Sequence, residues 1–482
     1  MAMERSPERI GLRIAKDDVI FRSVSPAHIS EVDAALVQIQ ADFLAEQSLG
    51  EEVLAKRWRA WTVSHEQTQT IAEVKRLAEA ARKEFDALLL LGVGGSDLGP
   101  RVIHETLDDP LHNRLSKAGR GGGLEVHFGG DTFDPRRLDA TLRTLGAEGK
   151  LPRTLVNVVS RSGKTAETFA ASLLVREALR KAKVRNWQRN VIATTLYADS
   201  SLLYQDRRKF FGLLPVPEGV GGRFSVASPV GLLPLALAAD ATRLGPGKRI
   251  DAALAGYAHG HEQAFGVKSA NARNAAFQLA KWLHLAEQYL HKSVLLFYNY
   301  ADDRYLGDWL TQLYSESIQE RGEGLNVIPT RGPTGNHSIL NGVVRGPRDK
   351  VVVFVKWGDL GCGGTKVPAS TGLMGDLADL GGLPLERIQD ASVAGVEADF
   401  TANGVPNVTL EVPRRDEGCL VQLMRVLMDT VAVKGRLQGL HLTGAGAPTP
   451  ERDLTYQQDG VEGYKEAMRG ELKRIRRRLG MK

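Results

Sequence analysis

Short apolar runs alternate with longer amphipathic segments along most of the chain. The short runs are rich in Leu, Val and Ile, whereas the longer segments repeat apolar residues at helical spacing. This alternation is typical of parallel β-sheets that helices cover on both faces. It predicts strands at 86–91, 124–128, 154–160, 191–195 and 210–216 in the first half of the chain, and at 293–298, 325–330, 350–356 and 407–412 in the second half.

The two series of strands predict an α/β fold with two doubly wound parallel sheets, each an αβα sandwich. Amphipathic stretches at 29–45 and 67–82 precede the first series and predict helices. The expected parts are a helical N-terminal arm (1–84), a first α/β domain (85–245), a second α/β domain (246–444) and a C-terminal loop and helix (445–482).

Composition places the 482-residue chain among ordinary globular proteins, with 43% hydrophobic and 25% charged residues. No apolar run approaches the ~20 residues that span a bilayer, and the first residues show no secretory signal pattern. The two cysteines, Cys362 and Cys419, are far apart and lack metal-ligand spacing. We therefore expect a cytoplasmic protein that does not bind membranes and carries free thiols.

A formal charge of +6 would suit an anionic ligand but does not identify one. The one dense basic run, at 473–478, could in principle contact nucleic acid. It ends an expected helix, where cations interact favourably with the last carbonyl groups. A solvated helix end is the preferred interpretation, and no nucleic-acid partner is expected.

A glycine-rich loop, Gly92-Val-Gly-Gly-Ser96, follows the first strand of the first domain. Glycines let the backbone turn sharply and approach a ligand, and a helix starting there offers N–H groups to an anion. A nicotinamide cofactor would need Gly-x-Gly-x-x-Gly and an acidic residue at the end of the second strand. That strand runs out through His127-Phe-Gly-Gly130 instead, so a phosphate loop or a structural turn fits better than a dinucleotide loop.

A second candidate loop, Ser160-Arg-Ser-Gly-Lys-Thr-Ala-Glu-Thr168, follows the third strand. Hydroxyl and N–H groups at a helix start suit a phosphate dianion, and the two cations add charge-assisted hydrogen bonds. The spacing differs from that of a nucleoside-triphosphate loop, so ATP hydrolysis is not supported. An ordinary capped helix is the alternative without a ligand.

With these loops in place, the chain resembles the phosphoglucose isomerase family, whose members contain two sugar-isomerase (SIS) domains. The resemblance covers about residues 85 to 470. The segments that carry it are 92–100, 160–168, 221–231, 309–317, 332–338 and 457–465.

The resemblance implies a glucose-6-phosphate isomerase activity, EC 5.3.1.9, in glycolysis and gluconeogenesis. The substrate would be a hexose 6-phosphate, and neither a cofactor nor a metal would be needed. The residues implied to hold the substrate phosphate are Ser96, Ser160, Arg161, Ser162 and Thr165, and Gly95 is a further expected substrate contact.

The resemblance also assigns the proton transfers. Glu316 would be the base that moves a proton between C1 and C2 through a cis-enediol, and Arg223 would stabilise the charge that develops on oxygen. Lys465 and His337 would open the sugar ring. In the family this histidine comes from the neighbouring subunit, which implies a homodimer. Gln312 and Gln458 would contact the sugar, Gln312 lying one helical turn before Glu316.

Several positions depart from the usual pattern of the family: Arg161, Lys164, Asn336, Asn341 and Gln457. These departures leave open a related substrate such as mannose 6-phosphate. They also leave open a sensor of SIS type that binds sugar phosphate without catalysis. Metal binding is not expected at His259 and His261 or at His284 and His291, because neither pair has a credible third ligand.

Overall fold

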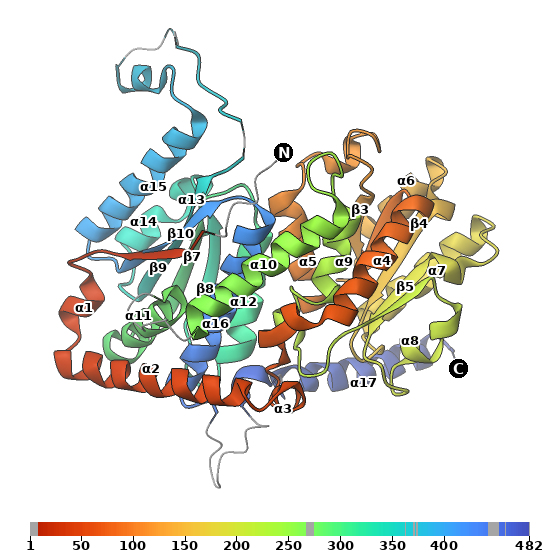
Figure 1. The fold of residues 1–482 in the computed structure, drawn as a ribbon, viewed down its shortest axis with the longest axis horizontal. Coiled ribbons are helices and arrows are strands. Elements are labelled where there is room, and N and C mark those ends of the chain that lie inside the picture. The colour runs from red at the N-terminus through yellow and green to blue at the C-terminus, as the bar shows by residue number, and fades with distance from the viewer. Residues whose placement is uncertain are drawn as a thin grey trace.

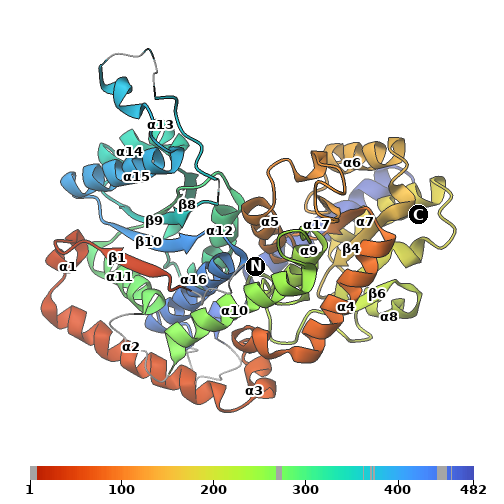
Figure 2. The same ribbon diagram turned by 45° about the horizontal axis from the view of Figure 1, so that its top comes forward.

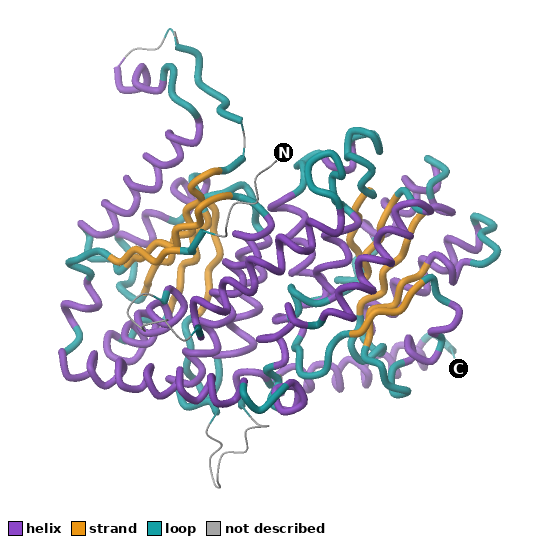
Figure 3. Tube along the Cα trace, in the orientation of Figure 1, coloured by secondary structure: helices purple, strands orange, loops and turns teal. Residues whose placement is uncertain are grey.

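A computed structural model describes residues 8–266, 274–361, 363–369, 372, 375–441, 453–457 and 459–481. Two five-stranded sheets lie on either side of a layer of helices (Figures 1 and 3). No helix in the described ranges is long and apolar enough to cross a membrane.

The first sheet is wholly parallel, with strand order β3-β2-β4-β5-β6. Its strands are β2 (Ala87–Leu91), β3 (Glu125–Gly129), β4 (Thr154–Val159), β5 (Val191–Thr195) and β6 (Gly212–Pro215). Each lies within the predicted stretch or within one residue of it, so the prediction of a doubly wound first sheet is confirmed.

Alternate residues of β2 enter different cores, as the two-residue period of a strand requires. Leu89 and Leu91 pack with α6 (Arg136–Ala147) and α7 (Ala166–Lys181) on one face. Leu88 belongs to the larger core on the other face. The helices that cover this second face are α4 (Thr68–Glu84), α5 (Gly95–Leu107) and α9 (Pro229–Leu237).

The second sheet has strand order β1-β10-β9-β7-β8. Its strands are β1 (Gly11–Ile14), β7 (Val294–Asn299), β8 (Asn326–Arg331), β9 (Lys350–Asp359) and β10 (Asn407–Arg414). Four of them are parallel and were predicted. The expectation of a purely parallel sheet and an entirely helical arm is corrected by β1, which pairs antiparallel with β10.

The core between the sheets is continuous and contains side chains from both of them, for example Leu88, Phe297 and Val353. Helix α16 (Glu417–Leu437) runs through this core and is buried from Cys419 to Gly435. Cys419 is a free thiol whose pKa burial raises to about 12. Cys362 lies outside the described residues.

The remaining long helices are α2 (Pro26–Gln47), α10 (Pro246–Phe265), α11 (Ala275–Leu290), α12 (Tyr305–Ile318), α15 (Leu385–Ala402) and α17 (Glu462–Arg478). The shorter ones are α1 (Val19–Ser23), α3 (Glu51–Lys56), α8 (Leu202–Gln205), α13 (Thr334–Ser338) and α14 (Leu340–Val344). The domain limits at 84, 245 and 444 stay a prediction. The first two fall between α4 and β2 and directly before α10.

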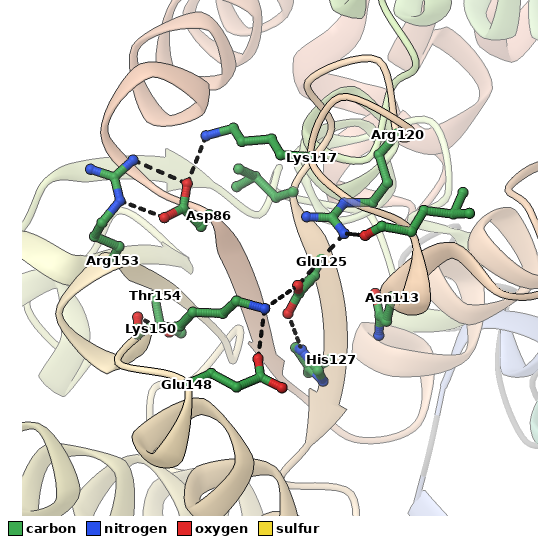
Figure 4. Close-up of polar contacts among 12 residues, drawn as sticks. Asp86, Asn113, Lys117, Arg120, Glu125, His127, Glu148, Lys150, Arg153 and Thr154 are labelled. Carbon is green, nitrogen blue, oxygen red and sulfur yellow. Dashed lines mark hydrogen bonds and ion pairs between the residues drawn. The ribbon is translucent and has the colours of Figure 1, made fainter.

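Ion pairs close the amino edge of the first sheet (Figure 4). Asp86, directly before β2, binds Lys117 and Arg153. Glu125 in β3 binds Lys150 at 2.6 Å. Burial would raise the pKa of Glu125, but hydrogen bonds with His127 and Lys150 outweigh it and lower this pKa to about 2. The glycine loop and the Ser160 loop lie at the opposite, carboxyl edge.

Candidate active site

The two candidate phosphate loops lie side by side because their strands are neighbours. Leu91 of β2 pairs with Val158 of β4, so the two strands end at the same level. Within the sheet, β3 lies on one side of β2 and β4 lies on the other, so the strand order reverses at β2. Ligands of doubly wound sheets bind in the crevice at such a change of direction. Both loops therefore lie at the carboxyl edge of the sheet, where a ligand is expected to bind.

The glycine loop makes a close approach that a larger residue would block. Gly94 has φ +58°, a conformation that favours glycine, and α5 begins at Gly95. A Cβ atom on Gly95 would lie 2.0 Å from the carbonyl carbon of Gly222. Ser96, in the first turn of α5, is half-buried. The loop thus packs directly against the segment that carries Arg223.

The Ser160 loop is ordered by its own hydroxyl groups and by that of Thr195 at the end of β5. The Ser160 and Thr165 hydroxyls are 2.8 Å apart, and the Thr195 hydroxyl donates to the Ser160 carbonyl at 2.7 Å. Ser162 is exposed and accepts a hydrogen bond from the Lys164 N–H group. The loop leads into α7, whose first N–H groups face the same edge of the sheet. This arrangement fits an anion.

Arg223 and Glu316 meet at the centre of the site, although they are far apart in sequence. Nη1 of Arg223 lies 3.3 Å from Oε2 of Glu316. Nε of Arg223 donates to the hydroxyl of Ser317 at 2.6 Å. Arg223 is buried, whereas the Glu316 side chain is 27% exposed, so a ligand can reach the carboxylate. A carboxylate beside a fixed cation suits proton transfer with charge development on oxygen.

Burial lowers the pKa of Arg223 to about 10, and the neighbouring Glu316 carboxylate partly offsets this effect. A guanidinium with that pKa still carries its charge at neutral pH. Arg223 therefore supplies a permanent positive charge with fixed donors.

Gln312 lies beside both the base and the glycine loop. Its Nε2 donates to Oε1 of Glu316 at 3.1 Å. A Cβ atom on Gly94 would lie 2.8 Å from the same Nε2 atom. Its Oε1 is buried and has no hydrogen-bond partner among the described residues. The expected one-turn relation to Glu316 is thus present, and the free acceptor could bind a sugar hydroxyl.

The C-terminal segment joins the site through its backbone. Nη2 of Arg223 donates to the carbonyl of Thr455 at 2.9 Å and to that of Gln457 at 3.3 Å. Lys465 follows in the first turn of α17 and is half-buried. Gln458 lies outside the described residues.

His337 lies apart from Glu316 within this chain. It is exposed on α13, directly after β8. Gly307, in the first turn of α12, packs against Pro329 near the end of β8. Glu316 is nine residues further along α12, roughly 13 Å along the helix axis. His337 therefore does not complete this chain's own cluster.

The neighbour of His337 explains how its helix is held. Oδ1 of Asn336 accepts hydrogen bonds from the hydroxyls of Tyr298 and Tyr300, and its Nδ2 donates to Ser392. Asn336, one of the departures from the family pattern, is thus part of the packing of α13.

Two contributors were missed in the sequence. Ser317 lies in the segment 309–317 without a role predicted for it, and its hydroxyl accepts a hydrogen bond from Arg223. The carbonyl of Thr455 gave no signal, because any residue type provides one. The described residues contain no group of three or more His, Cys, Asp or Glu side chains that could hold a metal ion.

Comparison with known proteins identifies the family of this chain. A family model described as phosphoglucose isomerase matches residues 45–245. A glucose-6-phosphate isomerase of Rubrobacter xylanophilus is 33% identical over 383 residues, which are 78% of this chain and 83% of that protein. One of Carboxydothermus hydrogenoformans is 30% identical over 414 residues, 84% of this chain and 85% of that protein.

Solved structures show the same architecture. A hypothetical protein of Thermus thermophilus matches with a TM-score of 0.77 and 28% identity, covering 96% of this chain and 99% of that one. A glucose-6-phosphate isomerase of Chlamydia trachomatis matches in fold, with a TM-score of 0.64 and 19% identity over 88% of this chain and 78% of that one. By sequence and fold together, the chain belongs to the phosphoglucose isomerase family.

Proposed function

We propose that this chain interconverts glucose 6-phosphate and fructose 6-phosphate, with Glu316 as the base. The contact of Glu316 with Arg223 and Gln312, beside two anion-binding loops, is the observation that carries this proposal. The reaction is an aldose-ketose isomerisation, consistent with the names of the relatives. We expect it to serve glycolysis and gluconeogenesis in the cytoplasm.

The phosphate group would bind at the carboxyl ends of β2 and β4, as predicted from the sequence. There the N–H groups at the starts of α5 and α7 and the hydroxyls of Ser96, Ser160, Ser162 and Thr165 converge on one edge of the sheet. The cation of Arg161 adds charge to this edge. With the phosphate held at this edge, C1 and C2 of the open sugar would be fixed beside Glu316.

In the aldose-to-ketose direction, Glu316 would remove the proton from C2. The electron pair of that C–H bond would form the C1–C2 double bond of a cis-enediolate, with negative charge on O1 beside Arg223. A proton then passes from O2 to O1, and protonated Glu316 returns its proton to C1. Atoms and charge balance without a cofactor, and the product is the 2-ketose.

Ring opening must precede this step, and we assign it to Lys465 and His337. His337 lies away from Glu316 in its own chain. We therefore propose a homodimer in which each site takes His337 from the other subunit.

Mixing two inactive variants tests the shared site. In a heterodimer of Glu316→Gln and His337→Asn subunits, one site carries both substitutions and the other carries neither. Refolding or exchanging the mixture should then restore about a quarter of the parental activity at equal mixing. If His337 serves its own subunit, every site keeps one defect and activity stays absent.

The reaction itself is tested by incubating the purified protein with fructose 6-phosphate in D₂O, with no cofactor added. Glucose 6-phosphate carrying deuterium at C2 is the expected product by NMR, because a carboxylic acid exchanges its proton with solvent. Mannose 6-phosphate, tested in parallel, measures substrate range. Binding of fructose 6-phosphate without any turnover would favour a sugar-phosphate sensor instead.

A further inference from the structure

Helix α3 ends on a tryptophan in a backbone conformation that usually belongs to glycine. Trp58 has φ 59°. Its N–H group donates to the Ala55 carbonyl at 3.0 Å, and the Arg59 N–H group donates to the Leu54 carbonyl at 2.7 Å. These two bonds define a Schellman motif with Trp58 at its left-handed position. A bulky side chain is disfavoured there, so its presence points to a role that glycine could not fill.

The indole of Trp58 contacts the Ser160 loop. Cζ of Arg161 lies 4.1 Å from the centroid of the tryptophan ring. This distance is well within the range of a cation–π contact, and tryptophan is the best aromatic partner for one. The contact joins the N-terminal segment of the chain to the loop at the carboxyl end of β4.

Other groups hold the guanidinium of Arg161 only weakly. Its Nε is buried and has no hydrogen-bond partner among the described residues, and Arg161 forms no ion pair within those residues. Burial lowers the pKa of Arg161, and the exposed carboxylate of Glu218 opposes the shift. Its donors are therefore not committed to an internal carboxylate, whereas an anionic ligand could accept from them.

Helix α3, which ends just before Trp58, packs closely against the segment that follows β6. Gly219, with φ +68°, follows β6, and a Cβ atom on it would lie 2.3 Å from Cα of Ala55. The end of α3 is therefore pressed against the loop that continues to Arg223. The end of α3 thus contacts both the Ser160 loop, through Trp58, and the segment that leads to Arg223, through Ala55.

We propose that Trp58 is a positioning residue for the phosphate end of the substrate. Its ring face would hold the planar fork of Arg161 so that two N–H groups meet two phosphate oxygens. The inference rests on the proposed function, because the hexose phosphate is the substrate assigned there. Trp58 would then contribute to substrate specificity from α3, outside the glycine loop and the Ser160 loop.

A matched pair of variants isolates the ring face. Trp58→Leu and Trp58→Phe are both apolar and place a side chain at the same left-handed position, but only phenylalanine offers a π face. We expect Trp58→Leu to raise the KM for fructose 6-phosphate roughly 5- to 30-fold with little change in kcat, and Trp58→Phe to retain most of the parental KM. Trp187→Leu is the control. The ring of Trp187 also faces an arginine, with Cζ of Arg176 5.2 Å from its centroid, but it lies before β5 at the opposite edge of the sheet from the site.

A double-mutant cycle tests whether Trp58 acts through Arg161. In an Arg161→Gln background, Trp58→Leu should cause no further rise in KM. A full additional rise would overturn the positioning role. Trp58→Gly, which relieves the left-handed backbone, replaces Trp58→Leu if the latter does not fold, with the same expected rise.

Ligand binding separates this inference from the proposed reaction. Sorbitol 6-phosphate has the phosphate but no carbonyl group, so it cannot be isomerised. Its dissociation constant should rise in Trp58→Leu and stay near the parental value in Trp58→Phe, whether or not the protein turns over fructose 6-phosphate. Equal binding by both variants would overturn the inference, and an inactive parent that still shows this difference would overturn only the proposed reaction.

Discussion

The guanidinium of Arg223 lies 3.3 Å from the carboxylate of Glu316, and it also bonds to Ser317 and to the carbonyl of Thr455. One buried cation thus links the segment after β6, helix α12 and the loop before α17. Helix α12 itself lies between the strands of the two sheets (Figure 2). Its position gives the site a fixed charge where an enediolate oxygen would form.

Replacing Arg223 with lysine should impair both catalysis and stability. An ammonium group keeps the charge but cannot serve Ser317, Glu316 and Thr455 in the same geometry. We expect kcat to fall roughly 10²- to 10³-fold. The free energy of unfolding should fall by about 1–3 kcal/mol, because buried acceptors lose their donors. Steady-state kinetics and urea unfolding measure the two effects.

The control for this variant is Arg304→Lys. Arg304 is 64% exposed at the start of α12 and pairs with Asp308. It should behave like the parent protein. An Arg223→Lys variant with parental kcat would contradict the role given to the guanidinium.

Two glycines of α5 should respond oppositely to alanine. A Cβ atom on Gly95 would lie 2.0 Å from Gly222, so Gly95→Ala must push the glycine loop away from Arg223. Gly99 is in the same helix with nothing within 4 Å of an added Cβ atom. We expect Gly95→Ala to lose activity and stability. Gly99→Ala should keep activity and match or exceed the parental stability by up to ~1 kcal/mol. Similar melting temperatures for both variants would contradict the close approach.

His284 should make stability depend on pH. Burial, with a smaller effect of Lys434, lowers the pKa of His284 to about 3, whereas an unfolded histidine has a pKa of ~6.5. Between these values the unfolded chain binds a proton that the folded chain does not, so stability falls as pH falls. From pH 7 to pH 5, the parent should lose about 2 kcal/mol more than a His284→Leu variant.

Urea unfolding at pH 5, 7 and 8 measures this difference. Between pH 7 and pH 8 the gap between the two proteins should change by only about 0.1 kcal/mol, because His284 is mostly neutral in both states there. Parallel stability curves down to pH 5 would show that His284 binds protons equally in the folded and the unfolded protein, which would contradict the lowered pKa.

Most of the fold could be predicted because its strands are locally distinct. The strand at 191–195 was predicted with its observed limits, since its β-branched residues begin directly after the polar Asn190 and continue to Thr195. Strand β1 was missed because it has only four residues and its partner, β10, lies almost 400 positions away. Nothing in a short, partly exposed segment indicates such an edge position.

The parts of the site that could be predicted are those whose side chains follow a recognisable spacing in the sequence. The loops at 92 and 160 follow strands, and Gln312 and Glu316 share a helical face, as local spacing requires. The carbonyl of Thr455 and the indole of Trp58 enter only through tertiary packing. Sequence spacing carries no information about either contact.

The most direct test of the central claim compares Glu316→Gln with Glu320→Gln in the conversion of fructose 6-phosphate to glucose 6-phosphate. Glu320 is an exposed carboxylate directly after α12 and serves as the matched control. If Glu316 is the base, kcat should fall at least ~10²-fold in Glu316→Gln and stay parental in Glu320→Gln. Parental turnover by a folded Glu316→Gln variant would contradict the proposed mechanism.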